Sequence, residues 1–205
     1  MTLHLAGEEA ADRLLTEDPF ALLIGMVLDQ QIPLERAFAA PLLLRERLGG
    51  SLDVQEIASM DPKALADIFS AKPALHRFPA AMANRVQILA ALLIENFGGE
   101  SNRIWTDAPD GAELLRNVKA LPGFGEQKAR IFIGLLGKQL GVRPDGWERA
   151  AGNFGTPGTF ASIADIDGPE ALRRVREHKA QMKAAAKAAK GLGTAGRPTR
   201  RPAPR

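Results

Sequence analysis

A glycine-rich turn followed by a lone acid contains the residue types in this chain that could do chemistry. Residues 121–129 read Leu-Pro-Gly-Phe-Gly-Glu-Gln-Lys-Ala, and Asp145 lies in a loop further along the chain. Glycine tolerates positive φ, and the first N–H groups of a helix have no partner within that helix. We expect the turn to open a helix and to hold an anion such as a phosphate. Asp145 then places one carboxylate a short loop beyond that helix.

The two glycines of the turn, Gly123 and Gly125, let the backbone take positive φ and direct successive N–H groups at one phosphate. Lys128 and Arg130 follow closely and could add positive charge to the same phosphate. Such contacts fix the register of a protein on a duplex without reading the base sequence. An ordinary corner between two helices explains the turn equally well, because Pro-Gly-x-Gly turns are common.

The composition excludes several kinds of site and of protein. The chain has 205 residues, 45% of them hydrophobic, which suffices for one sizeable core or two small lobes that share an interface. It has no cysteine, so disulfides, thiolate zinc sites and cysteine-ligated iron–sulfur clusters are excluded. We recognise no secretory signal, and the apolar runs are too short to span a bilayer. We therefore expect a cytoplasmic protein without a membrane partner.

The charge is divided unequally along the chain. Residues 1–170 contain 16 Lys and Arg against 23 Asp and Glu, a net charge of −7. Residues 171–205 contain 11 basic residues and one acidic residue, a net charge of +10. Non-specific attraction to a polyanion is therefore concentrated in the C-terminal part, and the acidic body would touch DNA only through a local site.

Helical spacing of apolar residues dominates the body of the chain, and alternation typical of strands is nearly absent. The expected helices begin at Asp18-Pro19, Pro33, Asp61-Pro62, about Pro79 (ending near Phe97), Asp110 and the end of the glycine turn. Pro41 predicts a kink or a break in the second of these helices. The fold class is accordingly predicted to be all-α.

The C-terminal part is predicted to change character twice. Residues 153–159 form a glycine-rich loop, and a long basic helix should then run to about Lys190. Its lysines at 179, 183, 187 and 190 would form a cationic stripe that strengthens DNA binding, although a merely solubilising role is the alternative. Residues 191–205 have no apolar period, and we expect a disordered basic tail.

Three segments in order resemble one family of DNA repair enzymes. These are Leu28-Asp29-Gln30-Gln31 after an apolar helix, the turn Leu121–Gly125 with Ala129, and Asp145. Over roughly residues 18–150 the chain resembles the helix-hairpin-helix (HhH-GPD) DNA glycosylase superfamily, which includes endonuclease III and 3-methyladenine glycosylase II. It is similar to the members that lack an iron–sulfur cluster. The resemblance implies a base excision repair glycosylase acting on double-stranded DNA that contains a lesion.

The register of the resemblance implies roles for two positions. Bifunctional members carry a catalytic lysine two residues after the second hairpin glycine, and here that position is Gln127. The essential aspartate of the family falls on Asp145, 18 residues beyond Gln127. Asp145 would stabilise an oxocarbenium-like sugar and orient the attacking water, although it is equally suited to cap a helix.

Because Gln127 has no amine, no Schiff base can form there, and we expect a monofunctional enzyme without AP lyase activity. Lys128 is the neighbouring residue, but one step along a helix turns a side chain by about 100°. The residues that flank Asp145 differ from those of the endonuclease III branch. The lesion that is excised therefore stays open.

The resemblance also implies residues that hold the flipped base and fill its place in the stack. Gln31 corresponds to a glutamine that enters the vacated space, and Leu75 lies where a leucine wedge occurs. Trp147, two residues from the acid, could stack on the extruded base. For each of the three a structural role is the alternative: a polar helix end for Gln31, and core packing for Leu75 and Trp147.

The hairpin of the family can also hold a monovalent cation. By resemblance, the main-chain carbonyls at about Lys119, Leu121 and Phe124 would coordinate Na⁺ or K⁺, and no other cofactor is required. The histidines at 4, 76 and 178 fit no metal-ligand spacing and are expected at the surface.

Together these inferences predict a two-lobed helical protein with a central cleft. Residues 33–140 would form a six-helix-type bundle that carries the hairpin. Residues 1–32 and 141–190 would form the second lobe, followed by the tail 191–205. We expect a nucleoid-associated monomer. The alternative is a non-catalytic protein that binds DNA or senses lesions through the hairpin and tail alone, which an exposed Asp145 with no adjoining pocket would favour.

Overall fold

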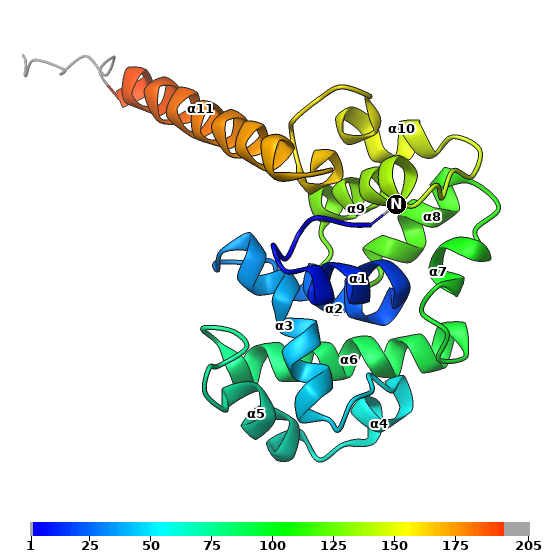
Figure 1. Cartoon of the computed structure of the whole chain (residues 1–205). Helices are drawn as coiled ribbons and strands as arrows, with labels where there is room; N and C mark the ends of the chain where they lie inside the picture. Colours follow the sequence, from blue (N-terminus) through cyan, green and yellow to red (C-terminus); the bar gives the residue numbers. More distant parts are fainter. Residues whose placement is uncertain (1, 195–205) are drawn as a thin grey trace, which may run out of the picture.

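The computed structural model describes residues 2–194, with side chains up to residue 187, and within them it contains helices and no β-strand (Figure 1). The predicted all-α class is thus confirmed. The α-helices are, in chain order, α1 (Glu9–Glu17), α2 (Pro19–Leu28), α3 (Leu34–Arg47), α4 (Val54–Ser59), α5 (Pro62–Ser70), α6 (Pro79–Phe97), α7 (Arg103–Thr106), α8 (Gly111–Lys119), α9 (Glu126–Gln139), α10 (Trp147–Ala151) and α11 (Pro169–Thr194). Two short 3₁₀ helices, η1 (Gly152–Gly155) and η2 (Ile163–Asp165), lie between α10 and α11.

Aspartate caps start three helices where the sequence predicts them. The carboxylate of Asp18 accepts the N–H of Phe20 at 2.8 Å, Asp61 accepts that of Ala64 at 2.9 Å, and Asp110 caps α8 in the same way. Each carboxylate satisfies an N–H group that has no partner inside its helix. These helix starts are therefore set by local chemistry.

The chain does not break at Pro41, because α3 runs continuously from Leu34 to Arg47, and the kink there stays a prediction. Proline removes one hydrogen bond from the helix, but Pro41 lies on the buried face of α3 beside Phe38. That face packs against α2 and α1, and packing of this kind supplies most of the stability of helices in proteins.

α2 is the central helix of the body. All of its residues from Phe20 to Leu28 are buried, and it packs against α3 and α6. α4 and α5 cover α6, while α8, α10, η1 and η2 pack against α9 (Figure 1). One continuous cluster of buried hydrophobic side chains extends from the N-terminal segment through α2 and α9 to the first turns of α11.

Contacts cross the predicted boundary between residues 33–140 and residues 1–32 plus 141–190. Both α1 and α2 pack on α3, which the prediction placed in the other lobe. The reason is that α2 is apolar on all sides and needs neighbours all round, a property that its own sequence does not assign to particular partners.

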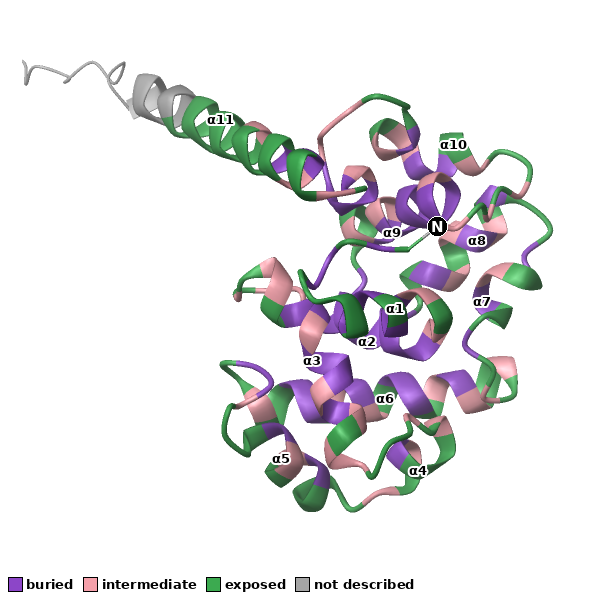
Figure 2. Cartoon of the chain, in the orientation of Figure 1, coloured by how far each residue is buried: buried purple, intermediate pink, exposed green. Residues whose placement is uncertain are grey.

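α11 extends away from the body (Figure 1), and among its described side chains only Ala171 and Val175 are buried (Figure 2). The helix continues to Thr194, so the prediction that it ends at about Lys190 is wrong. Residues 195–205 of the predicted tail lie outside the described residues. Within the described part, no helix is both long enough and apolar enough to cross a membrane.

The contact between α9 and α10 depends on a glycine. A Cβ atom added at Gly137 would lie 2.2 Å from Cζ3 of Trp147, so the indole ring occupies the space that a side chain would need. Trp147 therefore packs against α9.

We expect Gly137→Ala to lower the free energy of unfolding by about 1–3 kcal/mol, because the methyl group forces the indole to move. Urea denaturation measures this change. Gly168→Ala is the matched control, since a Cβ there meets nothing within 4 Å. Equal stability of the two variants would contradict the packing described here.

Candidate functional site

The glycine turn joins α8 to α9, and contacts of the buried residue Phe124 hold its conformation. The N–H of Phe124 donates to the carbonyl of Leu121 at 3.1 Å, and the Phe124 ring packs edge-on against Phe132 with centroids 5.7 Å apart. Gly123 has φ of +84° and needs glycine, whereas Gly125 has φ of −75°. The turn therefore takes positive φ at Gly123 alone of its two glycines.

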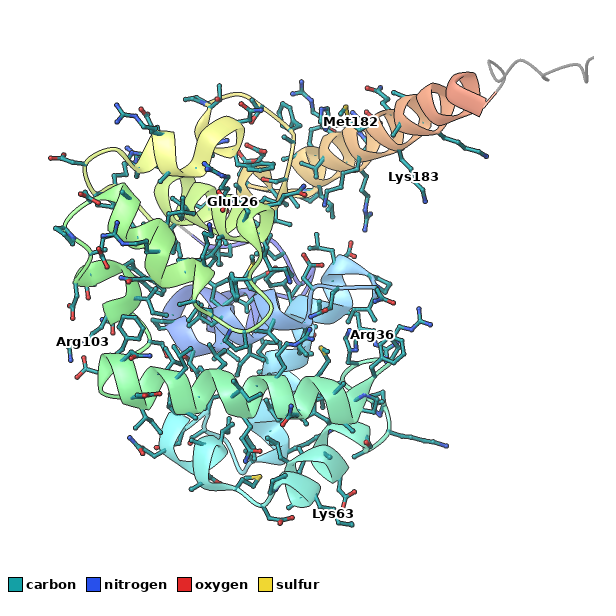
Figure 3. The ribbon with its side chains drawn as sticks, turned by 180° about the vertical axis from the view of Figure 1, so that it is seen from behind. Arg36, Lys63, Arg103, Glu126, Met182 and Lys183 are labelled. Atoms are coloured by element: carbon teal, nitrogen blue, oxygen red, sulfur yellow. The ribbon has the colours of Figure 1, made fainter. Side chains whose placement is uncertain are left out.

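The outer end of the turn is open. Gly123 and Gly125 are exposed, and no side chain caps the first N–H groups of α9. Glu126, at the start of α9 (Figure 3), forms ion pairs with Lys119 and Arg130. Hydrogen bonds from Lys119 and Arg130 lower the pKa of Glu126. These partners compensate its charge, and the N–H groups remain available to an anion.

Lys128 does not face this open end. Its Nζ donates to the carbonyls of Met26 at 2.6 Å and Asp29 at 3.2 Å, at the C-terminal end of α2. Burial lowers the pKa of Lys128, and the nearby Asp29 opposes that shift. The predicted phosphate contact of Lys128 is thus replaced by a bond between two helices, because its position in the first turn of α9 directs it at α2.

Arg130 is likewise occupied. Its Nε donates to Glu126 at 2.8 Å, and its Nη1 donates to the carbonyl of Ala150 at 2.8 Å. It joins α9 to α10 and is not free to act as a phosphate ligand at the turn.

The cation beside the turn is Arg85 of α6, which sequence analysis missed. Its Cδ would lie 3.2 Å from a Cβ placed on Gly123, and its Nη1 donates to Oε1 of Gln30 at 2.8 Å. No local signal marks it, because the folded chain brings it to the turn from a distant helix.

Asp145 is exposed and lies on another side of α9. The main-chain carbonyl of Asp145 accepts the N–H of Gly111 at 2.7 Å. Asp145 also lines an open hollow of about 510 Å³ together with Arg130 and Arg149. The N-cap of α10 is Gly146, so Asp145 is not the helix cap that was its structural alternative. Gln127 lines a different pocket, beside Asp29.

The three residues expected around a flipped base are not brought together. Gln31 is exposed with φ of +57°, and Trp147 packs on α9 with the Arg143 guanidinium 5.8 Å from its ring centre. Leu75 is only 2% exposed, so it cannot be a wedge. Its burial follows from a fold of residues 71–75 that the sequence alone did not reveal.

The exposed apolar side chain of this loop is Phe78, at 44%. Its N–H donates to Nδ1 of His76 at 3.0 Å, and Nε2 of His76 lies 2.9 Å from the carbonyl of Gln30. His76 is buried, so its expected surface position is wrong. Through it, the loop that carries Phe78 is fixed to the segment that carries Gln31.

The carbonyls expected to hold a monovalent cation are compatible with that role. Leu121 accepts one hydrogen bond, from Phe124, which leaves a second lone pair. Among the described residues there is no cluster of three His, Cys, Asp or Glu side chains that could hold another metal.

No family model matches the chain, and neither a curated protein nor a solved structure matches it. Function is therefore argued from the geometry of the turn, the exposed side chains and the two pockets beside α9.

Lys128→Met tests the bond between α9 and α2. We expect a loss of about 1–3 kcal/mol in the free energy of unfolding, because two buried carbonyls lose their donor while the apolar stem is kept. Chemical denaturation measures it. Lys63→Met is the control, since that side chain is 85% exposed, and we expect it to change stability little. If neither substitution changed the free energy of unfolding, Lys128 would not hold the two helices together.

Proposed function

We propose that the protein binds double-stranded DNA through a helix-hairpin-helix unit, α8–α9, and excises a damaged or mismatched base. The observation that carries the proposal is the open N-terminal end of α9 with the Arg85 guanidinium beside Gly123. Unpartnered N–H groups and a fixed guanidinium are together suited to a phosphodiester. The turn resembles the glycosylase hairpin, and this resemblance points to the phosphodiester of damaged DNA as its ligand.

The proposed DNA-binding face continues from the hairpin to two exposed side chains. Gln31 projects from the loop after α2, and Phe78 precedes α6, the helix that also supplies Arg85. The Arg77 guanidinium lies 4.7 Å from the centre of the Phe78 ring. An aromatic ring beside a cation can stack on a base while the cation meets a phosphate. In this proposal Phe78 takes the place that the resemblance implied for Leu75.

Two lobes with a cleft between them form the proposed architecture. One contains α3–α6 with α1 and α2, and the other contains α8–α10 with η1 and η2. The hairpin and the loops carrying Gln31 and Phe78 would border the cleft. Na⁺ or K⁺ on the hairpin carbonyls would neutralise backbone dipoles beside the phosphate, with no step of the reaction passing through the ion.

Asp145 is the carboxylate that the resemblance assigns to catalysis. The departing base takes the electron pair of the N-glycosidic bond, and a carboxylate near the sugar stabilises the positive charge that develops there. Gln127 offers no amine, which supports hydrolysis rather than strand cleavage.

A non-catalytic DNA-binding or lesion-sensing protein is the second candidate. The exposure of Asp145 favours it, as does the absence of Gln127, Gln31 and Trp147 from the lining of its hollow. The adjoining hollow with Arg130 and Arg149 favours the enzyme instead, because it could admit part of a nucleotide.

A panel of duplexes, each with one lesion, separates the two candidates. We expect abasic product from at least one lesion, and a rate lower by about 100-fold or more in Asp145→Asn if that carboxylate stabilises the transition state. Product is measured by alkaline cleavage of labelled strands. Duplex binding without product from any lesion would leave only the non-catalytic candidate.

Gly125→Ala tests phosphate binding at the turn. The backbone of Gly125 suits alanine, and a Cβ there meets no atom within 4 Å, so stability should not change. We expect duplex affinity to fall about tenfold, the equivalent of one charge-assisted hydrogen bond, because the methyl group obstructs the approaching phosphate. Binding is measured by fluorescence anisotropy at one fixed salt concentration.

Gly168→Ala, at an equally open position far from the turn, is the control for this change. Equal affinity of the Gly125 and Gly168 variants would exclude phosphate binding at the turn.

A further inference from the structure

A second pocket, of about 310 Å³, lies directly beside the first turn of α9. Its apolar surface comes from Met26, Ile131 and Ile163. Its polar groups come from four separate elements and are Asp29, Gln127, Lys128, Ser162 and Lys179. Gln127 and Lys128 belong to the same turn of α9 whose N–H groups are free. A ligand bound to those N–H groups would therefore lie next to the pocket.

Asp29 is the unusual group in this pocket. It follows the last residue of α2, and both of its main-chain groups have partners, since its N–H donates to Gly25 and its carbonyl accepts from Lys128. Among the described side chains, none donates a hydrogen bond to the Asp29 carboxyl, and no basic group forms an ion pair with it. Asp29 is partly buried, and a partly buried carboxylate without a protein donor needs a ligand or water to meet it.

The charged groups that face Asp29 come from two elements packed around it. Lys128 of α9 and Lys179 of α11 both favour its ionised form, but burial outweighs them and raises the pKa of the Asp29 carboxyl. Arg85 of α6 acts on Lys128, because its positive charge further lowers the pKa of that lysine. The site thus holds one partly buried acid among cations.

We propose that this pocket receives the sugar of a nucleotide extruded from duplex DNA, and that Asp29 is a catalytic carboxylate facing that sugar. The inference rests on the proposed glycosylase function. A carboxylate in a poorly hydrated pocket stabilises a developing cation more strongly than one in water. Asp29 meets this condition, whereas Asp145 is exposed.

The reaction balances with water as the only co-reactant. The C1′–N bond breaks, and its electron pair leaves with the base, which takes a proton from solvent. Water attacks C1′ and passes a proton through the Asp29 carboxylate to solvent, leaving a hydroxyl on the sugar. Lys128 serves as a positioning residue, because its bond to the Asp29 main chain holds that residue beside the pocket.

Duplexes that contain a charged sugar mimic test the proposal without turnover. One duplex carries a cationic pyrrolidine in place of a deoxyribose, and the other carries a neutral tetrahydrofuran. We expect the unaltered protein to prefer the cationic duplex by about tenfold or more, and Asp29→Asn to lose that preference. Glu95→Gln, which changes an exposed acid on α6, should keep it.

Excision of any lesion found in the panel provides the second readout. We expect Asp29→Asn to slow excision by about 100-fold or more. Activity of the unaltered protein should fall as the pH drops through the raised pKa of Asp29, since the carboxylate must be ionised. Loss of activity in Asp145→Asn alone, with Asp29→Asn unaffected, would overturn the inference while leaving the proposed function intact.

A structural role is separated from a catalytic one by stability. Because burial disfavours the charged form of Asp29, the folded state gains stability when this carboxyl is protonated. Removal of the charge in Asp29→Asn should therefore leave the melting temperature at pH 8 unchanged or higher. A lower melting temperature together with an unchanged preference for the cationic duplex would contradict the proposal. Failure of the unaltered protein to bind either duplex would instead reject the proposed function itself.

Discussion

The bond between the Lys128 ammonium and the last carbonyls of α2 is the interaction on which the site depends. α2 is buried throughout, and its C-terminal carbonyls have no partners inside the helix. Lys128 supplies the donors from the first turn of α9, at 2.6 Å and 3.2 Å. One side chain therefore fixes the glycine turn to the central helix of the molecule.

This arrangement explains the charges around the turn. Lys128 lies on the inner side of α9 and is withdrawn from a phosphate at the turn, so the outer side needs another cation. Arg85 fills that place, and Gln30 holds its guanidinium at 2.8 Å. The same segment carries Gln31, and His76 links it to the loop of Phe78. Two loops and two helices are thus held in a fixed relation around the end of α2.

Local chemistry made part of this structure predictable. The caps at Asp18, Asp61 and Asp110 depend on a carboxylate and the next few N–H groups, so the sequence alone indicates them. The span of α6 follows from its first-position proline and its closing glycine in the same way. The glycine turn was predictable for a similar reason, since its glycines and the start of α9 are neighbours in sequence.

The remainder depends on contacts between residues distant in sequence. Neither the direction of Lys128 toward α2 nor the approach of Arg85 to Gly123 has a local signature. Leu75 and Phe78 are both apolar loop residues, and only the packing of the folded chain buries one and exposes the other. The two carboxylates differ in the same way. Asp145 was identified from its spacing to the glycine turn. The partial burial of Asp29 depends on three helices, α2, α9 and α11, that come together only in the folded chain.

The central claim is that DNA meets this protein at the free N–H groups of the turn. Titration of the ¹⁵N-labelled protein with a short duplex, followed by amide NMR shifts, tests it most directly. We predict the largest shifts at the amides of residues 123–127, with smaller changes along α11. Duplex binding that shifts α11 while leaving the amides of the turn unchanged would contradict the account.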